Sequence, residues 1–355
     1  MTRERVVVAM SGGVDSSLSA ALLKEAGYDV VGVMMRLWSE EADESRGHRA
    51  CCSLEGSLDA RRVCQLLDIP FYYRNFEELF QKRVVDYFCA EYAAGRTPNP
   101  CLLCNQDLKF DLLLKEALAL GSRCLATGHY ARVEEHGGEY RLLRGVDPAK
   151  DQSYFLYTVG QHELSHLLFP LGGMTKKQTR RMAAERRLPT AERAESQEIC
   201  FIPDNDYRKF LSRFLPARPG DIVDTEGKAL GRHSGIANFT VGQRSRLGLT
   251  SKQPLYVLNI DPAKNRIVVG SWDDLFSDRL IAGNLHFVSG HAPEKPLEVA
   301  VKVRYKSPEA EALLEPMGDR VEVRFKESQR AITPGQAVVF YQGEVVLGGG
   351  TIEEA

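Results

Sequence analysis

The sequence predicts an α/β domain with a parallel sheet, followed by two small all-β domains, of which the last is barrel-like. In the first part of the chain, short apolar runs alternate with segments at helical spacing, a pattern typical of strand–helix–strand units. Further along, the pattern changes to short alternating runs separated by Gly, Pro and Asn turns, which indicates small β modules. We therefore expect domains at 1–215, 216–275 and 276–355.

The individual elements follow from periodicity and from turn residues. In the first domain we expect strands at 6–10, 30–35, 70–73 and 124–127, and helices at 18–24, 53–67, 76–92, 107–120, 161–168, 175–188 and 206–215. In the later domains the clearest strands are 255–258, 266–269 and 321–325. Ligands of parallel sheets bind beyond the carboxyl ends of the strands, and residues 11–17 follow the first strand directly.

Composition narrows the class of protein. The 355 residues are 43% hydrophobic and 26% charged, and no apolar run approaches the roughly 18 residues that span a bilayer. A strand begins almost at the N-terminus, which leaves no room for a signal peptide, so we expect a cytoplasmic protein without a membrane partner. Eight cysteines in a reducing compartment are buried, metal-binding or catalytic rather than a disulfide framework. Because the net charge is −2, any nucleic acid must bind to local basic patches.

The segment Ser11–Ser17 has the composition of a phosphate-binding loop. Its two adjacent glycines let backbone N–H groups turn inward, and the helix that follows offers unpaired N–H donors and a positive dipole end. No lysine follows the glycines, which excludes the G-x-x-x-x-G-K-[ST] loop. The serines and Asp15 favour a pyrophosphate-binding turn over a glycine turn that binds nothing.

The cysteines suggest a second kind of chemistry. Cys101 and Cys104 form a C-x-x-C pair behind two prolines that predict an extended entry, and Cys200 lies far along the chain. Zinc, iron–sulfur and dithiol redox sites all use C-x-x-C. A closed zinc site is poorly supported, because the sequence has no second C-x-x-C pair and no pair of histidines nearby. The remaining cysteines are expected in the core (Cys64, Cys89 and Cys124) or at a helix start or second metal site (Cys51 and Cys52).

Several motifs in succession resemble one family. They are S-G-G-V-D-S-S at 11–17, P-N-P-C-x-x-C-N at 98–105, T-G-H-Y at 127–130, K-D-Q-S-Y-F at 150–155, S-Q-E-I-C-F at 196–201, G-R-H-S-G at 231–235 and T-P-G-Q at 333–336. This order is similar to the tRNA-specific 2-thiouridylases, members of the PP-loop ATP pyrophosphatase superfamily with an adenine nucleotide α-hydrolase-like fold. The resemblance implies ATP-dependent replacement of the C2 oxygen of the wobble uridine by sulfur, in tRNA of the Lys, Glu and Gln type.

The resemblance also implies an ATP site that uses Mg²⁺. Asp15 would hold the Mg²⁺ and pyrophosphate, and Met35 and Gly128 would line the adenosine pocket, although Met35 taken alone indicates only strand packing. The phosphates would be surrounded by the backbone of Ala9, Met10, Ser11, Gly12, Gly13, Val14, Asp15 and Ser16.

For sulfur transfer the resemblance leaves two routes open. In one, Cys200 carries a persulfide and Cys104 either releases sulfide from it or closes a Cys104–Cys200 disulfide; both thiols should then be accessible. Many family members carry Asp where this chain has Cys101. Cys101, Cys104 and Cys200 could instead hold three corners of a [4Fe–4S] cluster whose fourth iron binds hydrosulfide. The sulfur donor would be a persulfide carrier or sulfide.

The implied partner is tRNA, bound by a monomer. Asn99, Pro100 and Cys101 would lie against the flipped uridine, and tRNA would also contact His129, Lys150, Asp151, Gln152, Arg304, Tyr305 and Gln336. His129 taken alone indicates a structural histidine.

Two basic patches favour RNA independently of the family. One comprises Lys176, Lys177, Arg180, Arg181 and Arg187, largely on one face of the helix at 175–188. In the other, Lys302, Arg304 and Lys306 alternate with apolar residues, so we expect one cationic face of a strand. For each patch, the alternative to RNA binding is a charged face that contacts only solvent. The alternative functions are another PP-loop adenylating ligase and a non-catalytic ATP-binding sulfur carrier.

Overall fold

The computed structural model describes residues 3–38, 54–194, 199–202 and 206–355, and it confirms the predicted fold class. Within these residues the N-terminal lobe contains a parallel five-stranded sheet in the order β3-β2-β1-β4-β7. Its strands are β1 (Arg5–Met10), β2 (Asp29–Arg36), β3 (Phe71–Asn75), β4 (Cys124–Ala126) and β7 (Leu167–Leu168). The chain goes from β1 to one side for β2 and β3 and returns to the other side for β4. The carboxyl ends of β1 and β4 therefore flank the point where the strand order reverses.

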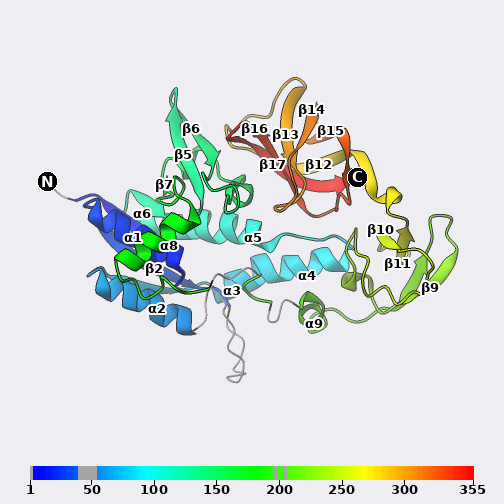
Figure 1. Cartoon of the computed structure of the whole chain (residues 1–355), viewed down its shortest axis with the longest axis horizontal. Coiled ribbons are helices and arrows are strands. Elements are labelled where there is room, and N and C mark those ends of the chain that lie inside the picture. Colours follow the sequence, from blue (N-terminus) through cyan, green and yellow to red (C-terminus); the bar gives the residue numbers. More distant parts are fainter. Residues whose placement is uncertain (1–2, 39–53, 195–198, 203–205) are drawn as a thin grey trace.

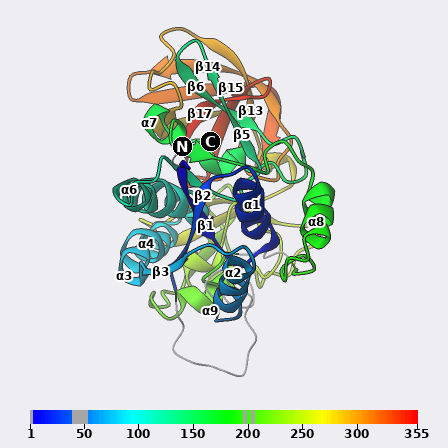
Figure 2. The same cartoon turned by 90° about the vertical axis from the view of Figure 1, so that its left-hand side faces the viewer.

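Helices cover both faces of this sheet (Figure 2). One face carries α1 (Val14–Glu25) and α2 (Leu54–Leu66), and α8 (Lys176–Glu185) packs beside α1. The other face carries two long helical segments. The first runs through α3 (Glu77–Phe80), a π-helical stretch η1 (Gln81–Val85) and α4 (Asp86–Ala93). The second runs through α5 (Pro100–Leu103), a π-helical stretch η2 (Cys104–Leu113) and α6 (Leu114–Ala119).

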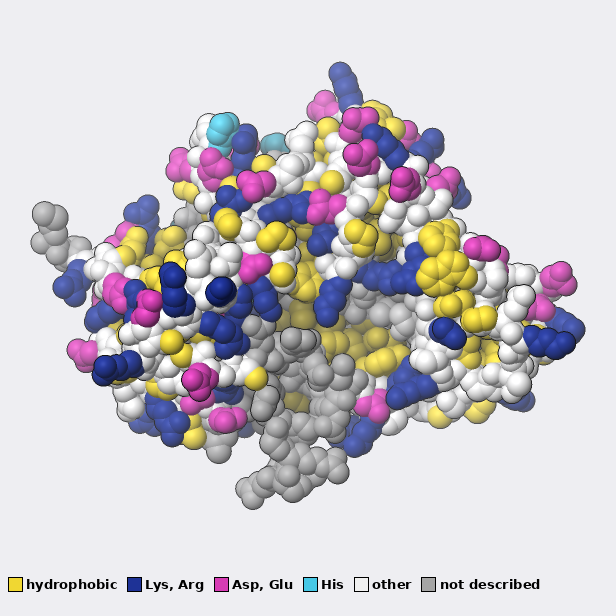
Figure 3. Space-filling view, in the orientation of Figure 1, with side chains coloured by type: hydrophobic (Ala, Val, Ile, Leu, Met, Phe, Trp, Pro, Cys, Tyr) yellow, Lys and Arg dark blue, Asp and Glu magenta, His cyan; other side chains and the backbone are white. Residues whose placement is uncertain are grey.

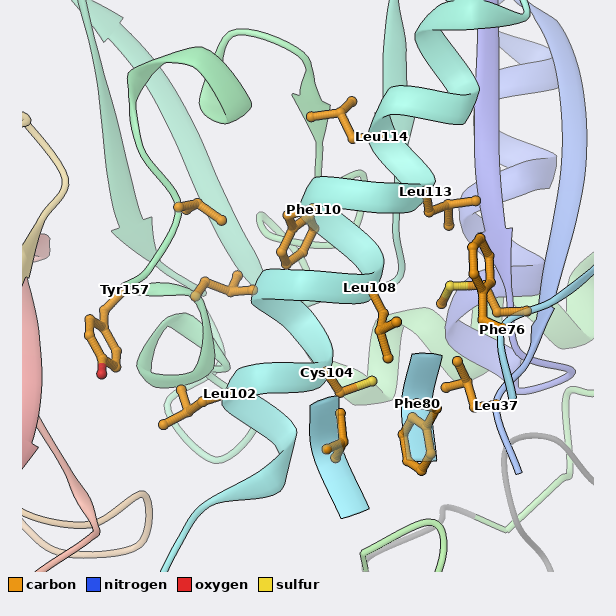
Figure 4. Close-up of a cluster of buried hydrophobic side chains, with 14 of the residues drawn as sticks. Leu37, Phe76, Phe80, Leu102, Cys104, Leu108, Phe110, Leu113, Leu114 and Tyr157 are labelled. Carbon is orange, nitrogen blue, oxygen red and sulfur yellow. The ribbon is translucent and has the colours of Figure 1, made fainter. Parts of the chain in front are cut away.

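The alternation of side chains along β1 accounts for the two layers. Val6 and Val8 pack with the helices α1 and α2, whereas Val7 belongs to the larger cluster on the opposite face. Figure 4 shows part of that larger cluster, in which Phe80, Leu108 and Leu113 meet between the two long helical segments. Both faces are apolar because helices bury both faces of the sheet.

Three predicted helices differ clearly in their bounds. The helix predicted at 107–120 begins earlier, at Pro100, because proline fits the first helical position and the Asn99 side chain accepts a hydrogen bond from Cys101 N (3.2 Å). The extended entry therefore ends at Asn99, and both thiols of the C-x-x-C pair lie on helix. The helix predicted at 161–168 is only α7 (Gln161–Leu164), and the leucines after it form β7, which pairs with β4. The helix predicted at 206–215 is α9 (Tyr207–Leu211).

The rest of the described chain forms two β units, which lie to the right of the N-terminal lobe in Figure 1. The first is a four-stranded sheet of β8 (Gly220–Val223), β9 (Ala229–His233), β10 (Tyr256–Asp261) and β11 (Arg266–Gly270). In the second, pairing of β12 with β17 closes six strands into a barrel. These are β12 (Phe276–Phe287), β13 (Leu297–Lys302), β14 (Ala310–Met317), β15 (Arg320–Arg330), β16 (Ala337–Gln342) and β17 (Val345–Glu354). The barrel interior is the cluster around Leu280, Leu314 and Phe340.

A hairpin from the N-terminal half joins the sheet of the barrel. Its strands are β5 (Ala131–His136) and β6 (Glu139–Arg144), and β6 pairs with β17 through Leu142 and Leu143. The barrel and the N-terminal lobe thus share one sheet, which fixes their relative position beside the carboxyl end of β4.

The predicted cationic strand face at 302–306 is wrong. The strand β13 ends at Lys302, and Arg304, Tyr305 and Lys306 lie in a bend and turn. Arg304 points back at the chain, where its Nη2 donates to the carbonyl oxygens of Arg330 (2.6 Å) and Ala331 (3.0 Å).

No helix in the described ranges is both long enough and apolar enough to cross a bilayer.

Candidate nucleotide and thiol site

A cavity of about 680 Å³ lies where the N-terminal lobe meets the barrel. It is lined by the glycine loop after β1, the residues after β4, the start of the helix at Pro100, the segment around Cys200, and Tyr305 and Lys306 from the barrel. In Figure 3 the surface is hollowed between the N-terminal lobe and the barrel, and Lys and Arg side chains gather over the region where α8 lies in Figure 1. The sequence places none of these segments close to one another, so the cavity is a product of the fold.

The loop of Ser11–Ser17 has the conformation that its sequence suggests. Gly12 has a φ of +70°, in the left-handed region that glycine adopts without strain. Ser16 Oγ accepts from Ser11 N (3.2 Å) and Ser17 Oγ donates to Gly13 O (2.8 Å), so hydroxyls hold the turn together. Among the described residues no side chain caps α1, which leaves its first N–H groups as donors at the cavity.

Gly128 packs directly on this loop. A Cβ at Gly128 would lie 2.8 Å from Ser16 N and 2.9 Å from the carbonyl carbon of Asp15. Only a residue without a side chain allows the end of β4 to approach the loop this closely. Met35, at the end of β2, is buried and also lines the cavity. The predicted ATP-binding residues therefore lie at one edge of the sheet, and all except Gly12 line the cavity itself.

Asp15 is bound to two side chains from other parts of the chain. The Lys176 ammonium lies 2.8 Å from Oδ1 and 2.7 Å from Oδ2, and the Tyr130 hydroxyl donates to Oδ1 at 2.8 Å. The expectation that Lys176 belongs to one exposed basic face of α8 is therefore wrong. Helical spacing places Lys176 and Arg180 on the side of buried Thr179, and of the four basic residues in the helix only Lys177 and Arg181 are exposed. Arg187 is exposed but lies beyond the end of the helix.

The three predicted site cysteines line the same cavity with different exposure. Cys101 is exposed and Cys200 is partly exposed, but Cys104 has only 9% of its surface accessible. In Figure 4 the Cys104 side chain points toward Phe80 inside the apolar cluster. The expectation that both reactive thiols are accessible thus fails for Cys104 in this conformation. Within the described residues, Cys104 and Cys200 are thiols that no disulfide joins.

The segment of Cys200 is held by its neighbour. The Phe201 ring makes edge-to-face contacts with Phe80 and Phe88, each at 5.5 Å between centroids, and with Phe210 at 5.2 Å. Phe80 therefore connects the Cys200 segment with the helix that carries Cys104. Residues 195–198, which complete the motif before Cys200, lie outside the described ranges, as do Cys51 and Cys52.

The described part of the chain places no group of three His, Cys, Asp or Glu side chains where it could hold a metal ion. The cysteines expected in the core are indeed buried (Cys64, Cys89 and Cys124). Burial raises the pKa of the Cys64 thiol to about 12, so this thiol is not a nucleophile at neutral pH.

The predicted tRNA-contacting residues fall into two groups. His129, Lys150, Gln152 and Tyr305 line the cavity, together with Pro100 and Cys101. Desolvation, with the Lys109 ammonium adding to it, holds the pKa of His129 well below its usual 6.5, so the ring is neutral at physiological pH. Its Nδ1 lies 2.7 Å from the Thr127 hydroxyl. A neutral imidazole contacts a base or ribose better than a phosphate.

The other group lies outside the cavity lining and makes contacts within the protein. Asp151 is 8% exposed and accepts hydrogen bonds from Gly145 N and Ser153 N, both at 3.0 Å. Gln336 Nε2 donates to Thr97 O (2.7 Å), and Asn99 caps the helix of the thiols. With Arg304, which binds backbone carbonyls, these residues shape the site, and their contact with tRNA stays a prediction.

Three cavity residues have contacts that the sequence reasoning did not assign. Lys109 donates to Asn105 Oδ1 (2.8 Å) from one turn further along the helix, Tyr130 binds Asp15, and Arg193 forms an ion pair with Asp59. A helix register running from Cys101 through Asn105 to Lys109 could have indicated the first. The T-G-H-Y motif placed Tyr130 at the site but did not indicate its contact with Asp15, and nothing local marks Arg193.

Three family models match the chain in succession. The tRNA methyl transferase HUP domain matches residues 4–204, the tRNA methyl transferase PRC-barrel domain matches 208–271, and the aminomethyltransferase beta-barrel domain matches 277–352.

Curated relatives match over nearly the full length. A tRNA-specific 2-thiouridylase MnmA of Geotalea uraniireducens is 53% identical, with 99% of this chain and 96% of the relative covered. One of Carboxydothermus hydrogenoformans is 51% identical, with 99% and 98% covered. A solved structure, the U34-tRNA thiolase NcsA of Methanococcus maripaludis, is 16% identical with a TM-score of 0.37, over 59% of this chain and 63% of that one. That structural likeness is too weak to support a conclusion about this chain.

Proposed function

The chain belongs to the tRNA-specific 2-thiouridylases, sulfurtransferases that modify tRNA, and on that premise we propose that it replaces the C2 oxygen of the wobble uridine by sulfur. One observation carries the proposal: the glycine loop after β1 and three thiols line the same cavity. An adenylating ligase that supplies nitrogen has no use for these thiols, and a sulfur carrier has no use for a nucleotide beside them.

The first step is adenylation. The uridine carbonyl is a poor electrophile, so its oxygen first attacks the α-phosphorus of ATP, and the bond to the β-phosphate breaks to release pyrophosphate. The loop N–H groups and the start of α1 bind the phosphates. Asp15 provides one carboxylate beside them, and one carboxylate plus phosphate oxygens is a donor set that Mg²⁺ accepts. Asp15 would hold the ion, which neutralises phosphate charge when bound.

The second step is transfer of sulfur. A persulfide on Cys200 attacks C2, and AMP leaves with the former carbonyl oxygen. The Cys104 thiolate then attacks Cys200 Sγ, which closes a Cys104–Cys200 disulfide and leaves the outer sulfur on uridine as the 2-thio group. A dithiol reductant and a persulfide donor must restore the cysteines. Because Cys104 is buried beside Phe80, this route requires the helix start or the Cys200 segment to shift when substrate binds.

The cluster route is the alternative for the same three thiols. Cys101, Cys104 and Cys200 line one cavity, which favours it, but the described residues do not converge as a metal-ligand set. We therefore derive no step through a cluster. Anaerobic purification followed by iron and sulfide analysis separates the routes. If the wild type contains about four irons per chain and Cys101→Ser contains none, the persulfide route is wrong and the cluster route takes its place.

The function is tested by mass spectrometry of nucleosides from tRNA incubated with ATP, Mg²⁺, a sulfur source and protein. The wild type should form 2-thiouridine, whereas Cys104→Ser should form none and still release pyrophosphate when tRNA is present. Cys89→Ala is the matched control, because Cys89 is a buried thiol that does not line the cavity. Full thiolation by Cys104→Ser would reject the role of this thiol, and absence of 2-thiouridine with the wild type would reject the function.

A further inference from the structure

A lysine lies against the glycine loop although the loop contains none. Lys176, 161 positions after Asp15, begins α8 and places its ammonium within 2.8 Å of both carboxylate oxygens of Asp15. Both side chains line the cavity. In G-x-x-x-x-G-K-[ST] loops a lysine of the loop itself contacts the β- and γ-phosphates. Here the fold brings a lysine from a distant helix to the corresponding neighbourhood.

The position of this ammonium is fixed by several contacts. The Lys176 side chain is only 12% exposed, and its Nζ lies 5.6 Å from the centre of the Tyr130 ring. The backbone N–H of Lys176 donates to Asp147 Oδ2 (2.9 Å), and Thr175 caps the helix. A long side chain that is held in place before a ligand arrives loses little conformational entropy on binding.

We propose that Lys176 is the phosphate-binding cation of this site and binds the β- and γ-phosphates of ATP and the departing pyrophosphate. The proposal rests on the proposed function, which requires cleavage between the α- and β-phosphates. Without nucleotide, the Asp15 carboxylate balances the ammonium. When the nucleotide enters, the ammonium turns to the phosphate oxygens, and the Asp15 carboxylate would hold the Mg²⁺ that neutralises phosphate charge. As the bond from the α-phosphorus to the bridging oxygen breaks, its electron pair stays on pyrophosphate, and the ammonium stabilises that charge.

The molecule contains a matched control for a merely structural role. Arg186, at the other end of α8, also joins this helix to α1, through Glu25 at 2.7 Å. It does not line the cavity. If Lys176 served only to dock α8 on α1, removal of either cation would have the same effect on nucleotide binding.

The experiment measures affinity by calorimetry for ATP, pyrophosphate and AMP, without tRNA or a sulfur source. Lys176→Met should bind ATP and pyrophosphate about ten-fold to a hundred-fold more weakly, since a charge-assisted hydrogen bond is lost, and should bind AMP within two-fold of wild type. Arg186→Met should match wild type for all three. Equal loss of ATP and AMP in Lys176→Met, or no loss of ATP, would overturn the proposal.

Lys176→Met leaves the Asp15 carboxylate without its positive partner, and a second comparison removes this effect. In the Asp15→Asn background, Lys176→Met should still weaken pyrophosphate binding about ten-fold or more. If the loss disappears there, Lys176 only neutralises Asp15 and the proposal is wrong. Because the assay contains no tRNA, a wild type that binds ATP but makes no 2-thiouridine would reject the proposed function and leave these comparisons valid.

Discussion

Substitution of Gly128 by Ala tests whether the site depends on the close approach of β4 to the glycine loop. The added Cβ would lie 2.8 Å from Ser16 N and 2.9 Å from two atoms of Asp15, the carbonyl carbon and Cβ. Ordinary carbon contacts begin near 3.4 Å, so the loop and the strand end must move apart by about 0.5 Å. Neither partner is the flexible end of a side chain, so the backbone must absorb the change.

The expected magnitude follows from this overlap. Overpacking of this kind costs about 1–3 kcal/mol, and the atoms displaced are those that present N–H groups to phosphate. If the cost appears in nucleotide binding, the Kd for ATP rises about ten-fold to a hundred-fold. Calorimetry with ATP measures this change, and thermal unfolding monitors the fold.

Gly173→Ala is the matched control, because a Cβ at Gly173 meets no atom within 4 Å. It should bind ATP like the wild type. If Gly128→Ala binds ATP within two-fold of wild type at an unchanged melting temperature, the loop does not bind phosphate in the conformation described, and the assignment of the site to this edge of the sheet is wrong.

Three further predictions concern the barrel, the histidine and the basic helix. Gln336→Ala removes the hydrogen bond to Thr97 O, which is worth about 1 kcal/mol. Backbone hydrogen exchange at 97–103 should therefore be faster in this variant in the absence of tRNA. An unchanged exchange rate would leave Gln336 with a tRNA-contacting role only. Because burial depresses the pKa of His129, the unfolded chain takes up a proton below about pH 6.5 that the folded chain does not, so stability should fall as pH falls, by up to about 1.4 kcal/mol per pH unit. Melting temperatures at pH 7.5 and 5.5 should therefore differ less in His129→Gln than in the wild type, and equal differences would contradict the assignment. Lys177→Ala with Arg181→Ala should weaken tRNA binding and lower the salt slope by about one to two, as measured by filter binding at several salt concentrations; an unchanged slope would show that these cations face only solvent.

The sequence predicted those features that depend on local pattern. Apolar runs at 6–10, 30–35 and 124–127 are strands because both faces of a parallel sheet are buried, and Ser11–Ser17 forms a turn because its glycines accept the required backbone angles. The motif order also predicted that Cys101, Cys104 and Cys200 belong to one site, and all three line one cavity.

Other expectations failed because their outcome depends on partners that are distant in sequence. The segment after β13 has a strand-like alternation but bends, since Arg304 binds carbonyls at the end of β15 and in the loop after it. The apolar pair at 167–168 looks helical in its own context but adds a strand to the edge of the sheet, where β4 offers hydrogen bonds. The buried position of Cys104 depends on Phe80 of another helix.

The Ser11–Ser17 loop shows most clearly which features follow from local sequence and which follow from tertiary packing. Its sequence alone predicted a phosphate-binding turn there, because two glycines, three hydroxyls and a helix start are all local properties. The sequence did not determine which cation stands beside it, and its pattern assigned Lys176 to an RNA-binding face. The tertiary structure decided that point, because the packing of α8 on α1 turns Lys176 inward to Asp15 while its neighbour Lys177 stays in solvent. Helical periodicity fixes which residues share a face, but only packing decides which face meets the site.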